Sequence, residues 1–131
     1  MAGQVSTFVF DKTGTLTKNG MSLHRIIPSH SADTRVFQEN MATWNALVFV
    51  QGEIKGDEQD LKVFGASGAT MTGIGSFATH EGVILRQLRI YHFSSKLKRM
   101  GVVVQNTENG QLWVHFKGAP EVILNKCKPG K

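Results

Sequence analysis

Apolar and polar residues alternate along the C-terminal half of the chain, in three stretches separated by turn-forming residues. A period of two is typical of half-buried β-strands. The Thr-Glu-Asn-Gly sequence at residues 107–110 favours a hairpin between the second and third stretches. We therefore expect strands at residues 83–93, 99–105 and 111–116, joined by two consecutive antiparallel pairings.

Two segments before these strands carry apolar residues at helical spacing. In the first, Ser31 or Asp33 can cap a helix whose apolar positions recur at i, i+3 and i+4. The helix runs through Val36, Phe37, Asn40, Met41 and Trp44, of which all but Asn40 are apolar. In the second, Asp57 suits an N-cap, and acids follow it where the helix dipole favours them. Leu61 and Phe64 would then point inward.

Four further stretches give shorter or weaker patterns. Residues 5–10 are mostly β-branched or aromatic and predict a short buried strand. Residues 21–27 predict another strand, and residues 47–50 predict the end of one. Residues 65–82 are rich in Gly, Ala, Ser and Thr, which predicts a mobile connection.

The end of the chain predicts one more helix. Pro120 suits its first turn, and Val122, Ile123 and Leu124 would form its buried face. Adding this helix to the strands above, we expect an α+β fold: an antiparallel sheet of about six strands with flanking helices.

Composition narrows the class of protein. The length of 131 residues and a 40% hydrophobic content suit one domain with one core. No apolar run approaches the roughly 18 residues that span a bilayer, so we expect a soluble chain that does not insert into a membrane. The single Cys127 excludes an internal disulfide and a cysteine zinc site. The net charge of +5 favours anionic ligands, of which a nucleoside triphosphate is one and RNA or an acidic membrane another.

The loop after residues 5–10 carries candidate chemistry. Asp11 at the carboxyl end of a buried strand could attack a phosphoryl group, because ligands of open α/β sheets bind outside those strand ends. Lys12 and the backbone amides around Gly14 would neutralise the phosphoryl oxygens, with Mg²⁺ bridging carboxylate and phosphate. The alternative is a strand that runs into a turn capped by Asp11.

Three motifs, in this order along the chain, resemble those of the P-type ATPases, the pumps that pass through an aspartyl-phosphate. Residues 11–17, Asp-Lys-Thr-Gly-Thr-Leu-Thr, resemble the phosphorylation signature of this family. Residues 93–100, with Phe-Ser-Ser followed by Lys98 and Met100, resemble its adenine-binding strand. Residues 117–121, Lys-Gly-Ala-Pro-Glu, resemble its nucleotide-domain signature. With the similarities between them, the motifs cover nearly the whole chain and look most like the type-five subgroup.

The resemblance implies a nucleotide site and a phosphorylation site. It implies catalytic roles for Asp11, Lys12 and Thr13, with Asp11 and Thr13 also holding Mg²⁺ in the intact protein. It further implies ATP binding, with an aromatic face, phosphate-binding cations and an acid beside the adenine amino group. The implied nucleotide-binding residues are Asp60, Phe93, Lys98, Met100, Lys117, Gly118 and Ala119. Gly118, which has no Cβ, would let the backbone approach the ligand closely.

The same resemblance implies the place of this chain in a larger protein. Residues 1–20 would form the edge of a phosphorylation domain and a hinge, and residues 21–131 a nucleotide-binding domain. The intact protein would be a membrane-bound cation pump with phosphorylation, actuator and membrane domains, this domain lying on the cytosolic side. The fragment alone would bind ATP weakly without phosphorylating itself, and the transported substrate stays undetermined.

Two departures and two alternative functions accompany this interpretation. Trp44-Asn45 stands where type-five members usually have Cys-His, and Glu58 where they usually have proline.

One alternative is a small haloacid-dehalogenase-like phosphatase or phosphotransferase, although Thr13 occupies the position where such phosphatases place a second aspartate. The other is a basic nucleic-acid-binding domain in which Tyr91 and Phe93 stack on bases. That alternative leaves the aspartate motif unexplained, so we expect no nucleic acid partner.

Overall fold

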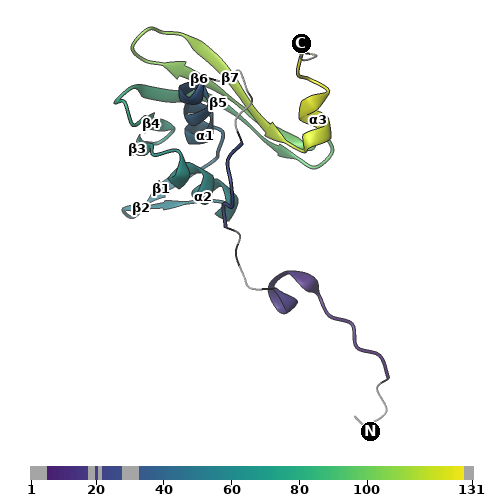
Figure 1. Ribbon diagram of the computed structural model, residues 1–131. Helices are drawn as coiled ribbons and strands as arrows, with labels where there is room; N and C mark the ends of the chain where they lie inside the picture. Colours follow the sequence, from purple (N-terminus) through teal and green to yellow (C-terminus); the bar gives the residue numbers. More distant parts are fainter. Residues whose placement is uncertain (1–5, 18–19, 21, 28–32, 129–131) are drawn as a thin grey trace.

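A five-stranded antiparallel sheet forms the centre of the protein (Figure 1). The structure is a computed structural model and describes residues 6–17, 20, 22–27 and 33–128. The strands follow the order β3-β4-β5-β6-β7, and β1 (Val48–Val50) and β2 (Glu53–Lys55) form a separate two-stranded sheet. The expected α+β class is confirmed, with the strands divided between two sheets. No helix in the described part of the chain is long and apolar enough to cross a membrane.

The three long strands form as their alternation predicts. They are β5 (Ile84–Ser94), β6 (Arg99–Asn106) and β7 (Leu112–Gly118). In the antiparallel register, Val102 of β6 lies between Ile90 of β5 and His115 of β7. Met100, Val102 and Val104 alternate onto the inner face and are almost fully buried there. This row is the core against which the helical layer packs.

The predicted mobile connection at residues 65–82 is wrong, because half of it is a folded hairpin. It contains β3 (Thr70–Gly73) and β4 (Ser76–Ala78), which pair with each other, and β4 pairs with β5. Phe77 is completely buried, and its ring lies edge-on to Phe64 with centroids 5.7 Å apart. Gly75, with φ of +64°, supplies the tight turn between the strands. At this position glycine forms a tight turn between two strands and does not indicate a mobile chain.

The helices begin where their caps predict. In α1 (Thr34–Thr43), the Asp33 carboxylate accepts from the Arg35 amide at 2.9 Å. In α2 (Glu58–Ala66), Asp57 accepts from the Gln59 amide at 2.9 Å. The short α3 (Pro120–Leu124) also forms, but none of its residues is fully buried. Val122 and Ile123 are half-buried and Leu124 is 70% exposed, so the predicted buried face forms only in part.

The two strands predicted in the N-terminal part are not formed. Residues 6–10 and 22–27, the described parts of those predictions, take no part in either sheet. Phe8, Val9 and Phe10 are 60–92% exposed, and the π-helix η2 (Lys12–Leu16) follows them outside the sheet (Figure 1). A strand needs a neighbour for its backbone groups and a surface for its apolar side chains. Neither is beside these residues in the described part of the chain.

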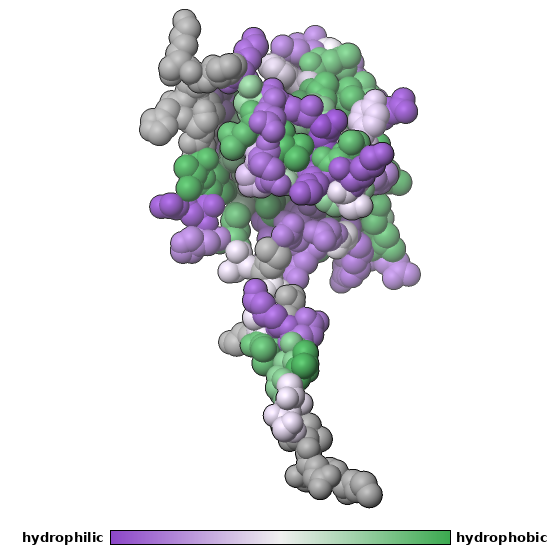
Figure 2. All heavy atoms as spheres, turned by 90° about the vertical axis from the view of Figure 1, so that its right-hand side faces the viewer, coloured by the Kyte–Doolittle hydropathy of each residue, from purple (hydrophilic) through white to green (hydrophobic). Residues whose placement is uncertain are grey.

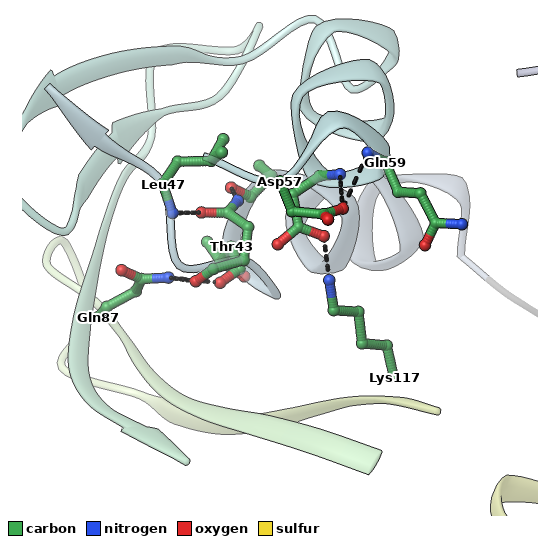
Figure 3. A network of polar contacts seen from close by, with 9 residues as sticks. Thr43, Leu47, Asp57, Gln59, Gln87 and Lys117 are labelled. Atoms are coloured by element: carbon green, nitrogen blue, oxygen red, sulfur yellow. Dashed lines mark hydrogen bonds and ion pairs between the residues drawn. The ribbon is translucent and has the colours of Figure 1, made fainter. Parts of the chain in front are cut away.

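A buried polar junction joins the C-terminus of α1 to the sheet. The Thr43 hydroxyl donates to the Glu39 carbonyl at 2.8 Å and lies 2.7 Å from Nδ1 of His115. Because that hydroxyl hydrogen is already used, His115 must donate from Nδ1, and its buried Nε2 has no hydrogen-bond partner. The Gln87 amide nitrogen donates to the carbonyls of Thr43 and Asn45 at 2.7 and 2.8 Å (Figure 3). These contacts fix the segment that leads from α1 to β1.

The stability of the fold should depend on pH through His115. Burial lowers the pKa of His115 from 6.5 to about 4. Between pH 6.5 and 4 the imidazole of His115 is protonated in the unfolded chain but stays neutral in the folded one. The contribution of His115 to the unfolding free energy is therefore complete above pH 6.5 and decreases as the pH falls toward 4. The loss over this window should reach roughly 3 kcal/mol, measured as the urea unfolding free energy.

A matched pair of variants isolates this effect. His115→Gln should abolish the fall in stability between pH 6.5 and 4, whereas His80→Gln, at an exposed position, should preserve it. Burial raises the pKa of Glu39, which stabilises the fold as pH falls and partly opposes His115. Because Glu39 is present in all three proteins, it cancels in the comparison. An unchanged pH profile in His115→Gln would contradict the assignment.

Candidate functional site

A pocket of about 720 Å³ lies at the end of the sheet where β6 begins and β7 ends. It brings together all seven residues predicted to bind nucleotide. They are Asp60, Phe93, Lys98, Met100, Lys117, Gly118 and Ala119. Ala46, Asp57, Gln59 and His92 complete the lining. The volume falls within the range of small-molecule sites, about 300–1,000 Å³.

Three elements that are distant in the sequence build the walls. The first turn of α2 contributes Asp57, Gln59 and Asp60. The end of β5 and the turn into β6 contribute Phe93 and Lys98 from the opposite side. The end of β7 and the start of α3 close the third side. Because the cap at Asp57 fixes where α2 begins, it also fixes the direction in which Asp60 points.

An ion pair between Asp60 and Lys117 links α2 to β7 in the lining of the pocket (Figure 3). The Lys117 ammonium donates to Oδ1 of Asp60. The Asp60 side chain is 9% exposed and that of Lys117 is 29% exposed. A carboxylate that is so little hydrated needs a partner, and its position in the first turn of a helix also stabilises its charge. The pair therefore places an acceptor and a donor side by side on one wall.

An aromatic ring and a thioether give the pocket its apolar surfaces. Phe93 is 63% exposed, whereas Met100 is only 4% exposed and comes from the inner face of β6. An exposed phenyl ring at a strand end has no packing role and is available to stack on a flat ligand. Buried Met100 provides a polarizable surface. A planar aromatic group would contact both kinds of surface.

Gly118 is required by its neighbours in the sheet. A Cβ at Gly118 would lie 2.5 Å from the Lys98 carbonyl oxygen and 2.8 Å from Cβ of Arg99, its cross-strand partner. Lys98 itself has φ of +48°, and its carbonyl accepts from the Ala119 amide at 2.9 Å. Gly118 thus lets the β5–β6 turn approach the end of β7. This contact with protein backbone is a different reason for glycine from the approach to a ligand expected above.

Lys98 provides the second cation of the site. Its ammonium lies 3.7 Å from the Glu121 carboxylate, and both side chains are about 60% exposed. An exposed pair of this kind contributes only about 0–1 kcal/mol, so it can open at little cost. Lys98 can therefore reach a ligand anion, whereas Lys117 is held by Asp60.

Sequence reasoning did not select four of the lining residues. Asp57 was predicted only as a helix cap, Gln59 as a first-turn residue and His92 as a strand residue, and the structure gives them these roles in addition to their place in the pocket. The sequence feature that could have identified Asp57 and Gln59 as pocket residues is their position beside Asp60 in the same helical turn. Ala46 carries no sequence signal, because only the course of the chain after α1 brings it to the pocket.

The predicted catalytic residues lie outside this pocket. Asp11 and Lys12 are exposed, at the start of η2, which contributes nothing to the pocket lining. Thr13 belongs to the same π-helix, and its side chain is not among those described. Within the described residues no three His, Cys, Asp or Glu side chains come together as a metal site. The donor set around Asp11 therefore does not fit Mg²⁺ as it stands.

Comparisons with known proteins agree with the predicted resemblance. The family described as P-type ATPase, cytoplasmic domain N, matches residues 76–129. The probable cation-transporting ATPase 13A4 of Gallus gallus is 31% identical over 98% of this chain and 13% of its own length. The 13A4 protein of Mus musculus is 33% identical over 98% of this chain and 14% of its length. The polyamine-transporting ATPase 13A3 of Homo sapiens is 30% identical over 98% of this chain and 14% of its own length. The chain thus spans about one seventh of these relatives.

The coupling free energy between Asp60 and Lys117 should be larger than that between the exposed Lys98 and Glu121. Lys117→Met leaves the Asp60 carboxylate unpaired and should lower the unfolding free energy by about 1–3 kcal/mol. The double variant Asp60→Asn/Lys117→Met should recover part of that loss. Urea unfolding of the four proteins of this cycle gives the coupling free energy.

The pair between Lys98 and Glu121 is the control. The corresponding cycle with Lys98→Met and Glu121→Gln should give a coupling below about 1 kcal/mol, because both groups stay hydrated. Equal coupling in the two cycles would contradict the structural role assigned to Asp60 and Lys117.

Proposed function

The chain is a relative of the type-five P-type ATPases, and on this premise we propose that its large pocket binds ATP. The observation that carries the proposal is the convergence of all seven residues of the expected nucleotide site on one pocket. The motif residues come from α2, the β5–β6 turn and β7, so a chance sequence similarity would have no reason to bring them together.

The base would occupy the part of the pocket between α2 and the sheet. Adenine would stack on Phe93 and contact Met100, which satisfies the preference of an aromatic ring for an aromatic face. Its amino group would donate to Asp60. Lys117, beside Asp60, can donate to the neighbouring ring nitrogen while the two side chains stay paired. This arrangement matches the donor and acceptor of the adenine edge without breaking a buried ion pair.

The phosphates would extend toward the exposed side of the pocket. Lys98 is the cation best placed to bind them, because its pair with Glu121 is exposed and weak. Lys117 was also expected to bind phosphate, but it could do so only by leaving Asp60 unpaired. We therefore assign Lys98 to the phosphates and Lys117 to the base.

In the longer protein we propose a cation-transporting ATPase. Residues 21–131 would bind the nucleotide, and residues 1–20 would belong to the phosphorylation domain and hinge. Asp11 would receive the γ-phosphoryl group after domain closure, with Lys12 and Thr13 beside it. Mg²⁺ would arrive with ATP and use Asp11 and Thr13 only when further ligands join them. The actuator and membrane domains, and a membrane location with this domain facing the cytosol, belong to the same proposal.

Nucleotide binding can be tested by ¹⁵N–¹H NMR titration with ATP and with AMP. ATP should shift the signals of Asp60, Phe93, Lys98 and Gly118 and saturate at roughly millimolar concentration, the weak end of the affinity scale. AMP should bind more weakly, because it lacks the two phosphates assigned to Lys98.

Variants separate the two parts of the pocket. Lys117→Ala should weaken ATP and AMP alike by roughly tenfold, about 1.4 kcal/mol. Lys98→Ala should weaken ATP selectively and so remove the difference between the nucleotides. Lys55→Ala, whose lysine pairs with Glu53 on β2 away from the pocket, is the control and should change neither affinity. A folded protein in which ATP shifts no pocket signal would contradict the proposal.

Asp11 should not be phosphorylated in this chain. Its carboxylate is exposed and lies outside the pocket that would hold ATP, so the γ-phosphoryl group has no fixed geometry for attack. Incubation with γ-labelled ATP and Mg²⁺ should leave the protein and Asp11→Asn equally unlabelled. Acid-stable label that is lost in Asp11→Asn and released by hydroxylamine would contradict this prediction.

A further inference from the structure

The cation assigned to the phosphates already has an anion beside it in the protein. The ammonium of Lys98, on the turn from β5 to β6, lies 3.7 Å from the carboxylate of Glu121 in α3. At that separation the contact is an ion pair without a hydrogen bond. In the described part of the chain, Lys98 is the cation within 4.0 Å of Glu121. A carboxylate therefore occupies the place beside Lys98 that a phosphate would take.

Backbone contacts hold these two side chains near each other. The Ala119 amide donates to the Lys98 carbonyl at 2.9 Å, and α3 begins at the next residue, Pro120. Gly118 permits this approach, because a Cβ there would lie 2.5 Å from the same carbonyl oxygen. Glu121 thus follows by two residues the amide that is bonded to the turn carrying Lys98. The two charges stay within reach of each other whenever this end of the sheet is folded.

The pair lies at the boundary of the pocket. Lys98 lines the pocket, whereas Glu121 does not. Their side chains are 60% and 64% exposed. Figure 2 shows hydrophilic residues exposed among hydrophobic ones on the side of the molecule that carries α3. Because the stem of a lysine is flexible, the ammonium can bind either the carboxylate outside the pocket or an anion inside it.

We propose that Glu121 is an intramolecular competitor for the phosphates of the nucleotide, and that it limits how strongly the pocket prefers ATP to AMP. This inference rests on the proposed function, in which Lys98 binds the phosphates. Bound triphosphate takes the place of the Glu121 carboxylate beside Lys98, and the carboxylate becomes hydrated. The free energy of the ion pair is thereby subtracted from the binding free energy of ATP. AMP lacks the phosphates that reach Lys98, so it leaves the pair intact.

The second ion pair of the site differs in the cost of breaking it. The Asp60 side chain is 9% exposed, so loss of Lys117 would leave a nearly buried carboxylate without compensation. Glu121 is in contact with water on either side of the exchange. Of the two carboxylates, Glu121 is therefore the one that a weakly bound nucleotide can displace.

Removal of the Glu121 charge tests the competition. An exposed ion pair changes an equilibrium constant by a factor between one and roughly five. Glu121→Gln should therefore raise the affinity for ATP roughly two- to fivefold and leave that for AMP unchanged. Glu108→Gln makes the same change of charge at an exposed position between β6 and β7, and should change neither affinity. The dissociation constants are measured by ¹⁵N–¹H NMR titration at one ionic strength.

A second background separates competition for Lys98 from simple repulsion between Glu121 and the phosphates. In Lys98→Ala no ammonium remains to compete for, so adding Glu121→Gln should not change the affinity for ATP. An equal gain in both backgrounds indicates direct repulsion and overturns the proposal. So does an affinity for ATP that is the same in Glu121→Gln, in Glu108→Gln and in the unmodified chain.

The ion pair can also be observed without nucleotide. The side-chain Cε–Hε signals of Lys98 should move in Glu121→Gln and stay in place in Glu108→Gln, while the amide spectra show that each variant is folded. Unmoved Lys98 signals in Glu121→Gln overturn the proposal. If no protein of the set binds ATP, the proposed function fails and the competitor with it. If ATP binds without a selective gain in Glu121→Gln, the competitor alone fails.

Discussion

The ion pair between Asp60 and Lys117 is the contact on which the pocket depends. It joins the first turn of α2 to the last residues of β7, and the two paired residues are 57 positions apart in the sequence. The Asp57 cap sets the start of α2, and the pair then holds that start over the sheet. With one partner missing, a nearly buried charge would be left without compensation. The same two groups that close the wall provide the acceptor and donor that a nucleobase edge requires.

The rest of the site follows from how the sheet ends. Gly118 allows the β5–β6 turn to approach β7, and the Lys98 carbonyl then fixes Ala119 at the start of α3. On the other side, Gln87 and His115 hold the segment after α1, from which Ala46 enters the pocket. Phe93 and Tyr91 line different pockets, so the nucleic-acid interpretation, which needs both rings on one stacking surface, gains no support.

Local signals could be predicted from the sequence, and features that need distant partners could not. The caps at Asp33 and Asp57 and the alternation of β5 to β7 act within a few residues, and the structure confirms them. Residues 5–10 have the composition of a strand, but a strand also needs a neighbour. Residues 65–82 have the composition of a linker, but Phe77 has a partner in Phe64 that no local pattern reveals. The seven nucleotide residues came from a family resemblance, and the structure adds that they share one pocket.

The central claim is that the adenine ring lies between Phe93, Met100 and the pair of Asp60 and Lys117. Intermolecular nuclear Overhauser effects between ATP and the protein test it most directly, because they report contacts between named protons. The account predicts contacts from adenine H2 and H8 to the Met100 methyl group and the Phe93 ring, together with the methyl group of Ala46. Contacts of the bound adenine only with residues outside this pocket, such as Phe116 and Leu97 on the outer face, would contradict it.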